Sequence, residues 1–208
     1  MTSSKIDQAA CESLAGCVAE IEKHTNAELV IVVRARSGSY SQADYLAGAL
    51  LAFLGLLFLL FSPISFQHYW VAIDVALLFL LGAFVSAKTR AIRRLLTRPK
   101  FREHAVRTGA AAMFYEAGIA NTQAELGVLV YLSLLERRLE VIADRGVLQS
   151  VPSLEWNECL FELHQAGKAT EFKALLKSLR LLGALLAAYV PATGENPNEL
   201  PDKPRIEL

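Results

Sequence analysis

The residues best suited to chemistry are charged side chains at the ends of short apolar runs. Glu136, Arg137 and Arg138 form a charged turn between two such runs. An arginine at a strand turn can bind a planar anionic group through two hydrogen bonds. Alternatively, the turn is a solvated hairpin tip whose charges keep the sheet from pairing with another edge. The three residues are therefore a candidate anion or turn site, with both interpretations open.

Carboxylates at three places are candidate ligands for a cation. Asp144 closes the apolar run 139–143, and Asp44 precedes a long apolar stretch. With Glu136 they would supply the oxygen ligands that Ca²⁺ prefers, although the chain has no DxDxDG loop. The alternative for Asp144 is a simple Asp-Arg pair at a strand end. Asp44, Glu136 and Asp144 are the metal candidates, and no cofactor other than Ca²⁺ is expected.

No motif brings a nucleophile together with a base. The sequence lacks G-x-S-x-G, HExxH and P-loop patterns, and its four histidines are scattered without metal spacing. The catalytic residues, if the chain is an enzyme, are not identified by sequence.

Two apolar runs dominate the middle of the chain. Residues 45–66 contain no charged side chain, and residues 69–87 contain one, Asp74. Each run is about 20 residues long, enough for a helix to cross a hydrocarbon core of about 30 Å. A chain of 208 residues has no room to surround two helices that are apolar on every face. The sequence predicts a transmembrane helical hairpin.

Polar and small residues inside these runs have two interpretations each. An acid within a membrane span is costly and by default suggests function, so Asp74 is a candidate intramembrane polar site. Alternatively Asp74, close to Tyr69 and the turn, reaches water at the outer interface. Gly48, Gly55 and Gly82 allow close helix packing, either within the hairpin or between protomers.

Basic residues set the predicted orientation of the hairpin. Eight lysines and arginines lie between 88 and 107, whereas the turn 62–68 has none. Cytoplasmic loops carry the excess of Lys and Arg, so both flanks and both termini are expected in the cytoplasm, with two spans across the cell membrane. The same charges attract anionic lipid. No aromatic interleaving or DNA-reading motif accompanies them, so nucleic acid is not an expected partner.

Around the hairpin, the pattern predicts a small α/β domain. Apolar periodicity and turn residues give helices at 4–24, 88–96, 101–117, 153–167 and 170–189, and strands at 28–34, 127–134 and 139–144, the last two antiparallel. The expected domain organisation is 1–44 for the first helix and strand, 45–87 for the hairpin, 88–191 for the remainder of the domain, and 192–208 for a polar tail.

Three segments resemble the TPM domain family, in particular its bacterial membrane branch. They are HTNAELVIVV at 24–33, the stretch from FREHAV to IADRGV at 101–147, and a C-terminal helix followed by a tail that contains NELPD at 198–202. The resemblance implies an α/β sandwich, a small mixed sheet flanked by helices, here with an inserted hairpin. It also implies that some relatives bind Ca²⁺ through carboxylates and that lumenal members act as acid phosphatases.

The expected function is that of an integral membrane protein with a cytoplasmic TPM-like domain, a membrane-tethered binding or scaffold module. The alternative is a Ca²⁺-dependent phosphatase of the TPM type. The expected partners are the lipid bilayer and a membrane protein or a second copy of the chain, bound through the hairpin.

Overall fold

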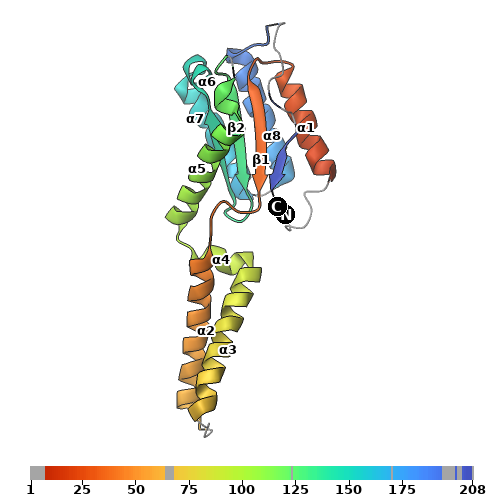
Figure 1. The fold of residues 1–208 in the computed structure, drawn as a ribbon. Helices are drawn as coiled ribbons and strands as arrows, with labels where there is room; N and C mark the ends of the chain where they lie inside the picture. The colour runs from red at the N-terminus through yellow and green to blue at the C-terminus, as the bar shows by residue number, and fades with distance from the viewer. Residues whose placement is uncertain are drawn as a thin grey trace. The chain divides into compact units, whose positions relative to one another are not determined.

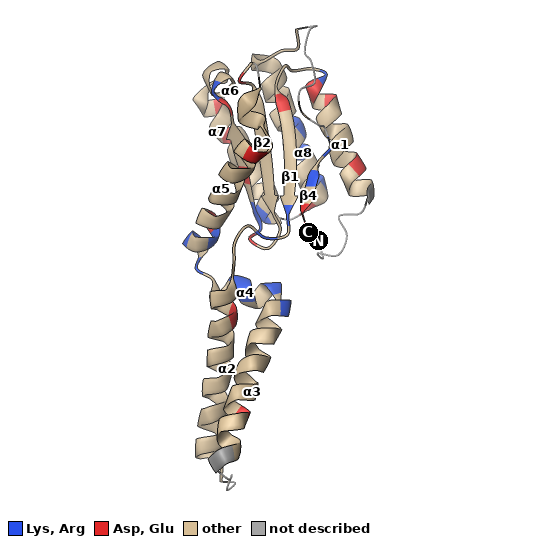
Figure 2. Ribbon diagram, in the orientation of Figure 1, with Lys and Arg blue, Asp and Glu red and all other residues tan. Residues whose placement is uncertain are grey.

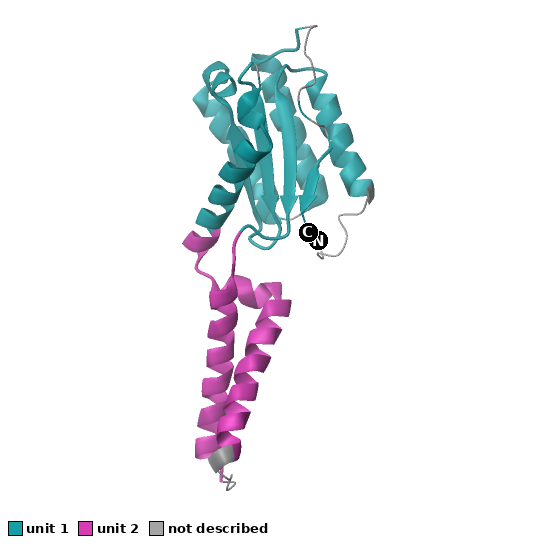
Figure 3. Ribbon diagram, viewed as in Figure 1, with its two compact units in different colours: residues 1–37, 103–208 teal, residues 38–102 magenta. Residues whose placement is uncertain are grey.

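The chain folds into two compact units, one inserted into the other. The computed structural model describes residues 8–63, 68–122, 124–169, 171–193, 200 and 203–207. One unit comprises 1–37 and 103–208, and the second comprises 38–102 (Figure 3). Residues 64–67 of the predicted hairpin turn are outside the described residues, as is most of the NELPD segment.

The first unit is built on a four-stranded mixed sheet in the order β3-β2-β1-β4 (Figure 1). Its strands are β1 (Glu28–Arg34), β2 (Gly127–Ser133), β3 (Arg138–Ala143) and β4 (Arg205–Glu207). β1 runs parallel to β2 and to β4, whereas β2 and β3 are antiparallel. The predicted α/β class with a small mixed sheet is thereby confirmed.

Helices cover both faces of the sheet, which is why its central strands are apolar throughout. Alternate residues of β1 point to opposite faces. Leu29 and Ile31 pack with α1 (Gln8–Glu22), α7 (Ser153–Ala169) and α8 (Phe172–Tyr189), and Val30 and Val32 pack with α5 (Pro99–Glu116) and the 3₁₀ helix η1 (Ile119–Asn121).

Three parts of the chain differ from the expected elements. Within the predicted polar tail, Arg205–Glu207 forms β4, and Arg34 Nε lies 2.5 Å from Glu207 Oε2. The strand predicted for 139–144 ends at Ala143, and Asp144 is the N-cap residue of a short helix, α6 (Arg145–Ser150). Pro99 is the first residue of α5, because its fixed φ and missing N–H suit the first turn of a helix.

The second unit is a helical hairpin followed by a short basic helix. α2 (Ser41–Phe61) and α3 (His68–Lys88) each provide a window long and apolar enough to cross a membrane, of which 11% is buried. The helix predicted for 88–96 is separate from α3 and begins at Arg90 as α4 (Arg90–Leu96). The two helices are separated by Thr89, which has an extended backbone with φ −110° and ψ 102°.

The hairpin glycines lie where its two helices meet. A Cβ atom on Gly48 would be 2.7 Å from the carbonyl oxygen of Phe79, and one on Gly82 would be 2.9 Å from that of Ala47. A Cβ on Gly55 would be 2.1 Å from a methyl group of Leu78. Of the two predicted uses for these glycines, the structure shows packing within the hairpin.

Candidate functional site

Glu136 is a buried acceptor and not part of a solvated tip. Its side chain is 3% exposed, its Oε1 accepts a hydrogen bond from the backbone N–H of Ser37 at 2.9 Å, and its Oε2 accepts one from the Ser133 hydroxyl. The Ser37 hydroxyl donates to Ser133 Oγ at 2.8 Å and lies 2.9 Å from the Tyr131 hydroxyl. This network joins the segment after β1 to the turn between β2 and β3.

The two arginines of the predicted anion site do not converge with Glu136. Arg137 is exposed and occupies the turn with φ +51°, whereas Arg138 forms an ion pair of 3.2 Å with Glu103. The sequence motif therefore separates into an inward carboxylate, an outward arginine and a paired arginine. The hydrogen bonds of Glu136 therefore stabilise the turn, and its three charged residues do not form a common anion site.

The three metal candidates lie at three different places. Glu136 and Asp144 are at opposite ends of β3, whose six residues extend roughly 20 Å at 3.3 Å per residue. Asp44 belongs to the other unit. Among the described residues, no group of three or more His, Cys, Asp or Glu is placed to hold a metal ion. Within the first unit, Glu136 and Asp144 are therefore too far apart to share a Ca²⁺ ion.

Asp144 instead serves the backbone at the start of α6. Its Oδ1 accepts a hydrogen bond from the Arg145 N–H at 2.7 Å, and its own N–H donates to the Gly127 carbonyl oxygen at 2.8 Å. A carboxylate is well suited to this position because the first N–H groups of a helix lack partners within the helix. The predicted alternative was an Asp-Arg pair at a strand end, whereas the structure gives Asp144 a hydrogen bond from the Arg145 backbone at the start of a helix.

Asp44 forms a buried ion pair that ties the three helices of the second unit together. The Arg93 guanidinium of α4 donates to both carboxylate oxygens, at 2.9 and 2.6 Å, and the Ser86 hydroxyl of α3 donates to Oδ1 at 2.8 Å. The hydrogen bond to Asp44 raises the pKa of Arg93 above its ordinary value. The sequence held a signal for this pair, since two spans of equal length bring residue 44 back beside residues 86–93.

Asp74 lies in the second turn of α3 and is partly exposed. Its position near the turn of the hairpin is compatible with either predicted role, so it stays a candidate intramembrane polar residue.

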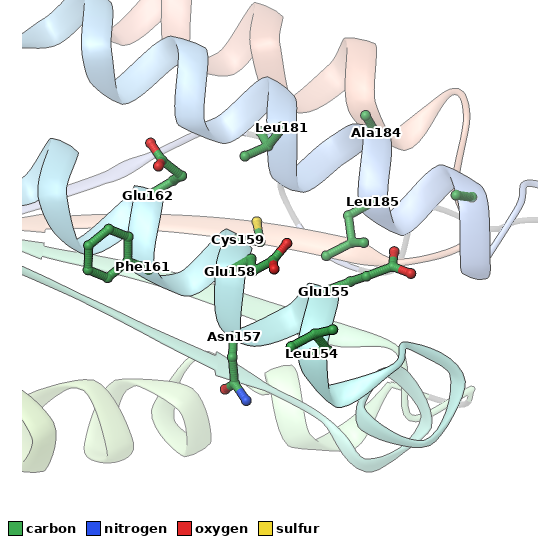
Figure 4. Close-up of a pocket in the computed structure, with 11 residues that line it drawn as sticks. Leu154, Glu155, Asn157, Glu158, Cys159, Phe161, Glu162, Leu181, Ala184 and Leu185 are labelled. Atoms are coloured by element: carbon green, nitrogen blue, oxygen red, sulfur yellow. The ribbon is translucent and has the colours of Figure 1, made fainter.

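A groove lies between α7 and α8, and sequence reasoning missed it. Its volume is ≈ 720 Å³, and Figure 4 shows the side chains that line it. Large apolar side chains line it while remaining accessible: Leu154 is 73% exposed, Phe161 59% and Leu181 48%. Neither helix hides these side chains in the core, because the core faces of α7 and α8 carry other residues, among them Leu163, Leu179 and Leu182.

Acidic residues accompany the apolar lining of this groove. Glu155, Glu158 and Glu162 follow one another on α7 at spacings of three and four, which places them on one side of the helix. They are the charged residues that line the groove within the described part of the chain. That spacing, with Leu154 and Phe161 seven apart, was the signal available in the sequence.

Cys159 lies at the bottom of the groove. It is 4% exposed, and burial, with the charge of Glu162 as a second cause, raises the pKa of its thiol to about 11. The thiol is therefore neutral near pH 7 and acts as an apolar side chain rather than as a nucleophile.

Comparisons with known proteins identify a shared fold. No protein-family model matches the sequence, and no curated protein matches it. Among solved structures, the chain is similar to the NMR structure of the BA42 protein from the psychrophilic bacterium Bizionia argentinensis sp. nov., with a TM-score of 0.60 and 15% identity over 99% of this chain and 98% of that one. At this identity the likeness concerns the fold.

Proposed function

We propose that this protein is a bacterial inner-membrane protein whose hairpin anchors a cytoplasmic TPM-type domain, and that the domain binds a partner in the α7–α8 groove. The resemblance of three sequence segments to the TPM family, together with the fold shared with BA42, supports the domain assignment. The groove is the observation that carries the binding role.

Large apolar side chains exposed on both helices of the hairpin support its role as a membrane anchor. Leu54 is 60% exposed, Phe58 68% and Phe61 81% on α2, and Leu80 is 62% and Phe84 61% exposed on α3. Contiguous apolar surface of this kind marks a contact with protein or lipid. Two neighbouring helices that are apolar on all sides suit lipid, because each backbone polar group in a helix interior is satisfied within the helix.

Charge supports the orientation of the hairpin. Lysines and arginines gather at the end of the hairpin that carries α4 (Figure 2). Since basic residues are retained on the cytoplasmic side, this end is inside and the turn at 62–68 is outside.

The groove fits an amphipathic helix with basic flanks. Its lining is mostly apolar, which suits the apolar stripe of a helix in helix-in-groove recognition. Its glutamates favour Lys and Arg beside that apolar stripe and disfavour an acidic segment or an anionic lipid surface. The occupant is therefore a helical segment of a partner protein, and the anchored domain is a scaffold that holds it at the membrane.

The orientation is tested with reporter fusions at the C-terminus and within residues 62–68, using alkaline phosphatase, which is active outside, and green fluorescent protein, which is fluorescent inside. We expect the two positions to report opposite sides, with the C-terminus inside. A periplasmic C-terminus would overturn the proposal.

The groove is tested with two designed helical peptides that share one leucine stripe and differ in flanks, arginine in one and glutamate in the other. We expect the detergent-solubilised full chain to bind the basic peptide in fluorescence anisotropy and to lose that binding in Leu181→Glu. Leu148→Glu is the matched control, since Leu148 is 52% exposed on α6 and does not line the groove. Equal binding of the two peptides would contradict the proposed docking role.

A further inference from the structure

A second hollow lies within the hairpin unit, between the start of α2 and the junction of α4 with α5. It encloses ≈ 330 Å³ and is lined from one side by Gln42 and Leu46 and from the other by Leu96, Thr97 and Arg98. Tyr40 packs edge to face on Phe101 with ring centroids 6.3 Å apart, which fixes one wall. The pocket thus belongs to helices that the Asp44–Arg93 ion pair holds together.

Polar and apolar groups divide the lining of this pocket. Ser39, Gln42 and Arg98 supply hydrogen-bond donors, whereas Leu46 and Leu96 are apolar and the Thr97 hydroxyl already donates to the Arg93 carbonyl oxygen at 2.7 Å. Along α2, the exposed residues Leu46, Leu50 and Phe53 continue from the pocket at spacings of four and three. An i, i+4, i+7 row forms a strip on one face of a helix, so the pocket opens onto an apolar path.

The second unit has an excess of positive charge, which favours an anionic ligand. Residues 38–102 contain seven lysines and arginines but two acids, Asp44 and Asp74. Asp44 is already bound to Arg93, and Asp74 lies on α3 in the second turn after the hairpin turn. Arg98 is exposed at the pocket and forms no ion pair with any residue that the structure describes.

We propose that this pocket binds the phosphate of an anionic phospholipid, with an acyl chain along the Leu46–Phe53 strip of α2. Arg98 contacts the phosphate through its planar fork of N–H groups, and the hydroxyl and amide groups of Ser39 and Gln42 donate to the remaining oxygens. The proposal rests on the hairpin spanning a membrane, as proposed above. It differs from general attraction between a basic surface and lipid because it assigns one pocket and one arginine.

The test is a lipid titration followed by native mass spectrometry of the full chain in an uncharged detergent. Phosphatidylglycerol and phosphatidylcholine with the same acyl chains are compared. We expect phosphatidylglycerol to bind about tenfold more tightly, because both lipids carry the phosphate but only phosphatidylcholine adds a trimethylammonium cation, which Arg98 and the neighbouring basic residues repel. Equal affinity for the two lipids would overturn the pocket as an anionic lipid site.

Two variants and a matched control separate a pocket from diffuse attraction. Arg98→Gln should weaken phosphatidylglycerol binding about tenfold, since it removes the charged hydrogen bond. Gln42→Phe, which fills the pocket without changing charge, should weaken it as well. Lys100→Gln removes the same charge two residues away, outside the lining, and should change affinity less than about twofold. Equal losses in Arg98→Gln and Lys100→Gln would overturn the assignment.

Two further arms identify the source of the phosphate and separate the two proposals. Glycerol phosphate should fail to displace phosphatidylglycerol at comparable concentration, and effective displacement would mean that the site takes a soluble phosphate. Alkaline carbonate should leave the protein in the membrane fraction. Release by carbonate would overturn the membrane anchor and the lipid site together, whereas retention without a preference for phosphatidylglycerol would overturn the lipid site alone.

Discussion

The Glu136 carboxylate accepts hydrogen bonds from two separate segments, the backbone of Ser37 and the hydroxyl of Ser133. Sequence reasoning identified the charged turn and left it as either an anion site or a solvated hairpin tip, and neither interpretation placed the Glu136 side chain in the interior. Glu136 is buried because of a long-range contact, since its donor Ser37 is 99 positions away in the chain. The residues next to Glu136 in the sequence therefore could not reveal its burial.

Removing the Glu136 carboxylate should destabilise the first unit. In Glu136→Ala, the buried Ser133 hydroxyl and the partly buried Ser37 N–H lose their acceptor, and the buried donor alone costs about 1–3 kcal/mol. For a unit of this size, each kcal/mol lowers the melting temperature by about 2–4 °C, measured by circular dichroism. Arg137→Ala is the control and should change it little, because Arg137 is exposed. Equal effects of the two substitutions would contradict the role given to Glu136.

Cys159 should make the free energy of unfolding depend on alkaline pH. Burial raises the pKa of its thiol to about 11 in the folded protein, whereas a thiol in an unfolded chain ionises near 8.5. The unfolded state therefore holds fewer protons between these values, and stability falls as pH rises from about 8.5 to about 11. Cys159→Ala removes this contribution.

Denaturant unfolding of both proteins at pH 8 and pH 10.5 measures the effect. The difference in stability between wild type and Cys159→Ala should narrow at the higher pH. A constant difference would show that the thiol does not titrate as described.

Among the elements, those with strong local patterns were predictable and those defined by distant partners were not. β1, β2, β3 and the long helices followed apolar periodicity. β4 has three residues, and its pairing with Val32, Val33 and Arg34 of β1 makes it a strand. The α7–α8 groove was missed for a related reason: its two walls are separate helices, and a pattern on one does not reveal the other.

Glycine substitutions should have opposite effects in α1 and in the hairpin. Gly48→Ala and Gly82→Ala place a Cβ within 3 Å of a backbone oxygen of the facing helix, so the helices must separate. Overpacking of this kind costs about 1–3 kcal/mol. Gly16→Ala meets nothing within 4 Å on α1 and should stabilise that helix by about 1 kcal/mol.

The apparent melting temperature in detergent should therefore fall in the two hairpin variants and rise in Gly16→Ala. A hairpin variant as stable as the wild type would mean that α2 and α3 do not pack as closely as the glycines allow.

For the whole molecule, the division into two units implies that the α/β unit can exist without the hairpin. Each unit has its own packing: the sheet with its two apolar cores in one, and the glycine contact with the Asp44–Arg93 pair in the other. Sequence alone indicated an insertion after the first strand. The boundary at 37/38 could not be placed from sequence, because Ser37 is held in the first unit by its contacts with Tyr131, Ser133 and Glu136.

Replacing residues 38–102 with a flexible Gly/Ser linker of about eight residues should give a soluble, folded α/β protein, since such a linker spans roughly 15 Å. We expect cooperative thermal unfolding without detergent, followed by circular dichroism, and monomers in size-exclusion chromatography. A variant with Glu136→Ala in the same background serves as the destabilised reference. Aggregation of the shortened chain would show that the sheet needs the hairpin to fold.

The strand order β3-β2-β1-β4 has a consequence for the order of synthesis. Both neighbours of β1 come later in the chain, beyond α2 and α3. Roughly 100 residues separate the end of β1 from the end of β2. At a synthesis rate of about 5–20 residues per second, both edges of β1 stay unpaired for about 5–20 s. The hairpin emerges during that interval. The apolar helices α2 and α3 must therefore be removed from water before the sheet can begin to form. During that time the unpaired edges of β1 are the part of the chain that a chaperone would have to cover.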